Sequence, residues 1–226
     1  MLYSNILDRS TSGSEIMDRF ISKNELIWIP YDKFENIKYL DKGGFGIIYK
    51  AKYKNYEVIL KSFNYLNNSD ESLSKFLNEC KIINSDEIIK IYGFTKDLNT
   101  LNYMLIMEYT NKGNLRECLS EITKDWKQRL FNLYKIIKGL NYIHKEGLIH
   151  YNFYDGNILC DKYDKYEKYD MVIYGIFIDD CLGLYQLAKS FLKENNIYGV
   201  IPFIAPEILR GQPYTQASDI YSFSMI

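Results

Sequence analysis

The chain has 226 residues, of which 47% are hydrophobic and 25% are charged, and its formal net charge is -1. This composition is typical of a globular protein with one large domain or two small lobes, and it lacks the basic excess of an electrostatic nucleic-acid binder. No apolar run resembles a secretory signal or approaches the roughly 18 residues of a membrane helix. We therefore expect no nucleic-acid partner, no membrane partner and a cytoplasmic location.

The cysteines are far apart in the sequence and form no C-x-x-C pair. They are Cys80, Cys118, Cys160 and Cys181. Neither a disulfide framework nor a metal site is expected from this spacing in a chain of this size, so we interpret them as reduced thiols.

The first third of the chain predicts a loose extension and then a small sheet. Residues 1–33 are predicted to be an N-terminal extension, which is polar and loose up to about residue 27 and ends in a short anchor at residues 28–31. Residues 34–40, 47–51 and 58–61 are rich in strand-forming side chains, and the glycines between the first two runs predict a hairpin turn.

A helix is predicted over residues 68–83, capped by Asn68 with Glu71 three positions later. Its apolar face is predicted to contain Leu73, Phe76, Leu77, Cys80 and Ile83. Two more strands are predicted over 88–94 and 103–109. The N-terminal unit, about 34–110, is thus expected to hold five antiparallel strands and one helix.

From residue 111 the pattern becomes helical. The longest predicted helix covers 126–145 and ends at Gly147, as a glycine C-cap would end it. Its buried face is predicted to contain Leu130, Leu133, Ile137, Leu140 and Ile143. Residues 161–170 alternate Lys, Tyr, Asp and Glu and predict an exposed insertion. A strand over 173–178 and a helix from 217 follow.

The run from His150 to Asn157 resembles the catalytic loop of protein kinases, H-R-D-x-x-x-x-N. Five further stretches match the same family in the same order. They are 41–46, 58–61, 105–109, 199–207 and 219–223. The chain is therefore identified as a member of the protein kinase superfamily, of the tyrosine-kinase-like sort, over about 34–226. The resemblance implies a bilobal α+β fold with an N-lobe over about 34–110 and a mainly helical, incomplete C-lobe over about 111–226.

The resemblance implies an ATP site in the N-lobe. The residues it assigns are Asp41, Gly43, Gly44, Gly46, Ile48, Ile59, Lys61, Met107, Glu108 and Tyr109. The glycine-rich loop would cover the phosphates, and the backbone of residues 108–110 would bind adenine. Asp41 stands where the family has its first glycine, which adds a negative charge near a polyphosphate. Ile59 replaces a small residue against the adenine ring.

The resemblance also implies the catalytic residues. Lys61 would contact the phosphates and pair with Glu79. His150 keeps its family position, but Tyr151 replaces an Arg that reads a phosphorylated activation loop. Asn152 occupies the position of the catalytic Asp, and an amide cannot act as a base near neutral pH.

For Mg²⁺, the resemblance implies Asn157 and one residue of the D-F-G region. Without a gap, Gly183 places Cys181 at the metal position, whereas one inserted residue brings Asp180 there. We favour Asp180, because Mg²⁺ prefers hard oxygen ligands.

The chain stops at Ile226, before the remaining helices of a kinase large lobe. We therefore expect Phe223, Met225 and Ile226 to be left largely uncovered, in a fragment, in a truncated copy or in a domain whose partner covers that face.

Three functions fit these residues. One is an active non-standard protein kinase that uses ATP and Mg²⁺ on a protein substrate. The second, which we favour, is a pseudokinase that holds ATP as a scaffold module, because Asn152 and the D-F-G region depart from the family pattern. The third is a degenerate truncated copy without a folded function.

Overall fold

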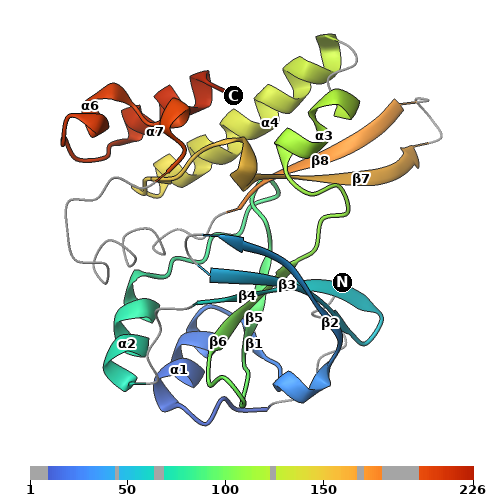
Figure 1. The fold of residues 1–226 in the computed structure, drawn as a ribbon, viewed down its shortest axis with the longest axis vertical. Coiled ribbons are helices and arrows are strands. Elements are labelled where there is room, and N and C mark those ends of the chain that lie inside the picture. The colour runs from blue at the N-terminus through green and yellow to red at the C-terminus, as the bar shows by residue number, and fades with distance from the viewer. Residues whose placement is uncertain (1–9, 44–45, 64–68, 123–125, 167–170, 180–198) are drawn as a thin grey trace. The chain divides into compact units, whose positions relative to one another are not determined.

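We describe the chain from a computed structural model, which covers residues 10–43, 46–63, 69–122, 126–166, 171–179 and 199–226 (Figure 1). These residues divide into two compact units, which are described separately. The N-terminal unit contains residues up to 82 together with 90–109. The C-terminal unit contains 83–89 and the described residues from 110 onward.

The N-terminal unit is built on a six-stranded sheet with the order β1-β5-β6-β4-β3-β2. The strands after β1 (Ile27–Trp28) are β2 (Phe34–Gly43), β3 (Gly46–Tyr53), β4 (Tyr56–Ser62), β5 (Ile91–Lys96) and β6 (Tyr103–Glu108). The neighbours among β2 to β6 are antiparallel, which confirms the five predicted strands. β1 adds a sixth strand and pairs in parallel with β5.

The prediction of a loose extension up to about residue 27 is wrong from residue 15 onward, because residues 15–33 have regular structure. This segment forms α1 (Glu15–Lys23), β1 and the short helix η2 (Tyr31–Lys33). The hydroxyl of Ser14 caps α1 by accepting from Met17 N, and the side chain of Met17 is fully buried. Apolar side chains at positions 17 and 21 give even this polar stretch one face that it can bury.

The second helix of this unit, α2, covers Asp70–Glu79 and is shorter than predicted. Ser69 caps it by accepting from Ser72 N, whereas Asn68, the predicted cap, lies outside the described residues. Leu73, Phe76 and Leu77 are buried as expected. Ile83 does not belong to this face, because it packs against the core of the C-terminal unit.

The C-terminal unit is mainly helical (Figure 1). Its helices are α3 (Leu115–Ile122), α4 (Trp126–Lys145), α6 (Pro206–Leu209) and α7 (Gln216–Ser224), with the short helices η3 (Asp155–Asn157) and η4 (Ile201–Phe203). Its strands β7 (Ile158–Tyr166) and β8 (Met171–Ile178) form an antiparallel hairpin. The predicted exposed insertion at 161–170 has strand structure up to residue 166, where β7 pairs with β8 across a register shift between Tyr163 and Tyr166.

The predicted limits of α4 are confirmed, but its predicted buried face is only half right. Leu140 and Ile143 are fully buried, whereas Leu130 and Leu133 are 48% and 38% exposed. Gln128 and Asn132 are buried in their place, and Gln128 Nε2 donates to Asn132 Oδ1 at 2.8 Å. Because the two amides satisfy each other, this face can bury them without a large desolvation cost.

The last residues are better covered than predicted. Phe223 and Ile226 pack against the core of the C-terminal unit, and Met225 remains 47% exposed. Among the described residues, no helix has both the length and the apolar character needed to cross a lipid bilayer.

The buried carboxylate of Glu87 joins the segment 83–89 to α4 through ion pairs. Glu87 is 3% exposed, and its Oε1 accepts from Lys135 at 2.8 Å and from Lys138 at 2.7 Å. Burial alone would raise the pKa of Glu87, but the hydrogen bonds from Lys135, Lys138 and Ser85 outweigh it and lower the pKa to about 2, from an ordinary value of 4.5. The ionised carboxylate is thus strongly favoured in the folded state.

This ion cluster predicts an acid-sensitive contribution to stability. A depressed folded-state pKa contributes stability above pH 4.5 that is lost as the pH falls toward 2. Between pH 5 and pH 3 the natural chain should lose about 2 kcal/mol more than Glu87→Gln in urea unfolding. Equal losses in the two proteins would contradict the ion cluster, and Glu146→Gln, at an exposed position, is the matched control.

Candidate functional site

Five predicted ATP-site residues share one face of the sheet, whereas Glu108 is opposite Val58 and belongs to the other face. In the strand register, Ile48 is opposite Lys61 and also opposite Asp41, and Ile59 is opposite Met107. Directly paired residues point to the same side of a sheet. We call this side the Lys61 face. The intervening residues, such as Val58 and Leu60, are fully buried in a core on the other side.

The composition of the Lys61 face fits a nucleotide. Ile48, Ile59 and Met107 offer aliphatic contact to a flat base, and Lys61 offers a positive charge for phosphates. Glu79 is the last residue of α2, but its side chain lies outside the described part of the structure. The pairing of Lys61 with Glu79 therefore stays a prediction.

Close packing explains the glycine at one end of the predicted hairpin turn. Gly43 pairs with Gly46 at the end of the β2–β3 hairpin, whereas Gly44 lies outside the described residues. A Cβ on Gly46 would lie 1.7 Å from the carbonyl oxygen of Ser62, so only glycine fits this close approach of two strands. Asp41 is exposed, and its Oδ1 accepts from Lys42 N at 2.7 Å.

Residues 107–109, at the end of β6, include the backbone groups predicted to bind adenine. Glu108 N donates to the carbonyl of Lys90 at 2.9 Å, so this N–H is already used within the protein. Lys50, on β3, contacts Tyr109. Its Nζ lies 3.8 Å from the centre of the Tyr109 ring and 2.7 Å from Glu57 Oε1. Burial would lower the pKa of Lys50, but hydrogen bonds to Glu57 and Tyr109 raise it overall.

In the C-terminal unit, the loop from His150 is held by one buried carboxylate. Asp219, on α7, is 2% exposed. Its Oδ2 accepts from His150 N at 2.8 Å and lies 2.9 Å from His144 Nε2, and its Oδ1 accepts from Tyr151 N at 3.1 Å. Three groups on two elements thus converge on this carboxylate.

The loop backbone is strained where Asp219 holds it. Tyr151 has a φ of 69°, in the left-handed region that costs a residue with a side chain of the order of 1–3 kcal/mol. The ring of Tyr151 lies 5.4 Å from that of Tyr214. Charge-assisted hydrogen bonds to Asp219 offset the strain, because each is stronger than a bond between neutral groups.

Asn152 occupies the predicted centre of this loop. Its N–H donates to His150 Nδ1 at 3.3 Å, and its carbonyl accepts from Asn157 Nδ2 at 2.8 Å. The acceptor role of Nδ1 implies that a neutral His150 carries its proton on Nε2. His150, Asn152 and Asn157 thus lie together in this loop, joined by hydrogen bonds.

Asn157 links the loop to the end of β8. Its carbonyl accepts from Asp179 N at 2.8 Å. The side-chain oxygen of Asn157 is a hard ligand of the kind Mg²⁺ prefers. Asp180, Cys181 and Gly183 lie outside the described residues, as does the activation segment up to residue 198, so both registers of the D-F-G region remain open.

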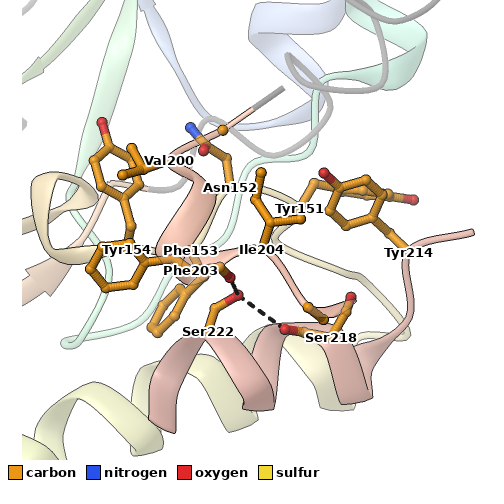
Figure 2. A pocket seen from close by; sticks show the side chains of 12 residues that line it. Tyr151, Asn152, Phe153, Tyr154, Val200, Phe203, Ile204, Tyr214, Ser218 and Ser222 are labelled. Carbon is orange, nitrogen blue, oxygen red and sulfur yellow. Dashed lines mark hydrogen bonds between the residues drawn. The ribbon is translucent and has the colours of Figure 1, made fainter. Parts of the chain in front are cut away.

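A small pocket lies beside this loop (Figure 2). Its lining combines residues 151–154 with 199, 200, 203–205, 214, 218 and 222. Figure 2 shows Asn152 and the ring of Tyr154 on one side, with Ser222 below them. Ser222 Oγ donates to the carbonyl of Phe203 at 2.6 Å, which ties η4 to α7. The pocket thus brings the Asn152 loop together with the segment that precedes α6.

Asp219 lies in a stretch that matches the family, but its role could not be predicted from the sequence, and neither could that of His144. Asp219 accepts from backbone N–H groups of the loop, and His144 contacts the loop only through Asp219. Backbone partners leave no residue signature in a sequence. The one available signal was the match of residues 219–223 to the family pattern.

Comparisons with known proteins agree with this geometry. Residues 34–226 match the protein kinase domain family. Relatives include the probable serine/threonine-protein kinase gdt4 of Dictyostelium discoideum (28% identical, 88% of this chain and 12% of that protein) and the serine/threonine-protein kinase CTR1 of Arabidopsis thaliana (27%, 88% and 24%). A third is the putative serine/threonine-protein kinase/receptor R826 of Acanthamoeba polyphaga mimivirus (29%, 88% and 12%). The chain spans a quarter or less of each of these relatives. It belongs to the protein kinase domain family.

Proposed function

We propose that this chain is a nucleotide-binding kinase-like module of the cytoplasm, which takes Mg-ATP but transfers phosphate poorly or not at all. Asn152 carries this proposal. It is held in the loop by His150 and Asn157, as a catalytic residue would be, yet its side chain is an amide. The relatives named as serine/threonine kinases support the nucleotide and a protein hydroxyl as the substrate class.

The chemistry follows from the residue types. Lys61 and the aliphatic side chains of its face support binding of the nucleotide, and Asn157 would contribute an oxygen ligand to Mg²⁺. When bound, the metal neutralises charge on the phosphates. The amide oxygen of Asn152 accepts a hydrogen bond from a substrate hydroxyl and so orients it. It does not take the proton, because an amide has no useful basicity near pH 7.

Nucleotide binding is tested by thermal unfolding with ATP, in the presence and absence of Mg²⁺. Ligand at 100 times its dissociation constant should stabilise the chain by about 2.7 kcal/mol. Lys61→Ala should remove most of this effect. Lys145→Ala, at an exposed position in the last turn of α4, should retain it. The absence of any shift in the natural chain at millimolar Mg-ATP would reject the proposal.

An active kinase of non-standard chemistry is the second candidate. The observation in its favour is that Asp219 still fixes the loop backbone through His150 and Tyr151. Phosphoryl transfer depends mainly on positioning and electrostatics, so a positioned substrate retains part of the catalysis without a base. The Asn152→Asp comparison in the Discussion separates the two candidates.

A further inference from the structure

Residues 10–29 precede the part of the chain that matches the kinase family, yet they are built into the N-terminal unit. The match begins at residue 34, after α1 and β1. Met17 and Ile29 are among the most buried residues of the chain, at 0% and 1% exposure. A segment outside the family domain has therefore become part of its core.

This segment wraps around the β5 edge of the sheet. In the parallel pairing, Ile27 is opposite Gly93 and Trp28 is opposite Phe94. A Cβ on Gly93 would lie 1.8 Å from the carbonyl oxygen of Ile27, so the strands approach as closely as glycine allows. Ile29 continues into the core on the side away from Lys61. The edge is thus closed by main-chain pairing, with side chains buried on the far side of the sheet.

On the Lys61 face, α1 packs beside α2, as Figure 1 shows. A continuous series of aromatic contacts joins the two helices. The ring of Phe20 on α1 lies 6.0 Å from that of Phe94, at an interplanar angle of 79°. Phe94 lies 6.3 Å from Phe76 on α2, and Phe76 lies 5.0 Å from Phe63, two residues after Lys61.

We propose that residues 10–29 act as a clamp that positions α2 on the Lys61 face, with Phe20 as the positioning residue. Phe63, Phe76 and Phe94 are fully buried, so they can shift only together. Phe20 is the residue that the clamp contributes to this series of aromatic contacts. Removing its ring deprives Phe94, which also contacts Phe76 on α2, of an edge-to-face contact. The position of Glu79, and with it the phosphate end of the site, then depends on α1.

Amide hydrogen exchange of the full chain tests the clamp without using nucleotide. Phe20→Ala should speed exchange in α2 by about tenfold or more and leave α4 unchanged, because the loss is local. Phe20→Leu, which refills most of the volume, should restore the protection. Arg19→Ala is the matched control, since Arg19 is exposed on the same helix and pairs with Glu15. Unchanged exchange in α2, or an equal rise in α4, overturns the proposal.

A second readout rests on the proposed nucleotide binding. Phe20→Ala should raise the dissociation constant of Mg-ATP about fivefold or more at a temperature where the variant is folded, and Phe20→Leu should reverse this. A natural chain that fails to bind Mg-ATP defeats the proposed function, while hydrogen exchange still decides the clamp. If Phe20→Ala does not fold, Ile21→Val removes one buried methyl group from α1. Unchanged α2 exchange in that folded variant likewise overturns the clamp.

Discussion

Asp219→Ala is expected to release the loop at His150 and Tyr151 and to lower the free energy of unfolding by about 4 kcal/mol. The substitution leaves two backbone N–H groups without their acceptor in a site where the carboxylate is 2% exposed. Each buried donor left unsatisfied costs about 1–3 kcal/mol. The strained backbone of Tyr151 also loses the contacts that hold its φ at 69°.

Denaturant unfolding measures the loss, and hydrogen exchange at the amides of His150 and Tyr151 locates it. Asp155→Ala is the matched control, because Asp155 lies in the same loop but pairs at the surface with Arg116, at 2.7 and 2.9 Å. Its effect should be much smaller. If Asp219→Ala does not fold, Asp219→Asn retains one carbonyl oxygen and should show the same faster exchange. Wild-type protection of these amides in either variant would contradict the role assigned to Asp219.

The family and the positions of its motifs could be predicted from the sequence, whereas the hydrogen bonds between Asp219 and the loop from His150 could not. The family could be identified because several specific patterns occur in the expected order and at the expected separations. They include the strand that carries Lys61, the loop from His150 and residues 205–207. The strand register then places Ile48, Ile59, Lys61 and Met107 on one face of the sheet. The hydrogen bonds between Asp219 and the loop were not predictable, since the donors are backbone N–H groups 68 and 69 residues earlier in the chain.

The errors have a similar cause. Apolar periodicity predicted the length of α4 but placed Leu130 and Leu133 inside, because a period cannot show that two amides satisfy each other in the core. The segment containing α1 has a cap at Ser14, but its nine-residue helix and two-residue strand are too short for periodicity to reveal. Their stability comes from contacts with Phe94 and Gly93, which are distant in the sequence.

Asn152→Asp is expected to raise the rate of phosphoryl transfer by about 10²- to 10⁴-fold, the usual contribution of a positioned base, which corresponds to roughly 3–5 kcal/mol of barrier. The loop should accept the change, because the hydrogen bonds that hold Asn152 within the described part of the chain use its backbone N–H and carbonyl. Its side chain is also only partly buried, so a carboxylate there keeps part of its hydration.

The measurement is the initial rate of transfer from labelled ATP to the chain itself and to a general protein acceptor. The natural chain and Asn152→Asp are compared, each also with Lys61→Ala. Activity that appears only with Asn152→Asp and disappears with Lys61→Ala supports an impaired kinase whose missing element is the base. Equal, Lys61-dependent rates in both proteins would instead identify an active kinase in which orientation by the Asn152 amide suffices. If neither protein transfers phosphate although both bind Mg-ATP, the defect lies beyond residue 152, and substitutions at Asp180 and Cys181 become the next comparison, because either residue can occupy the metal-binding position.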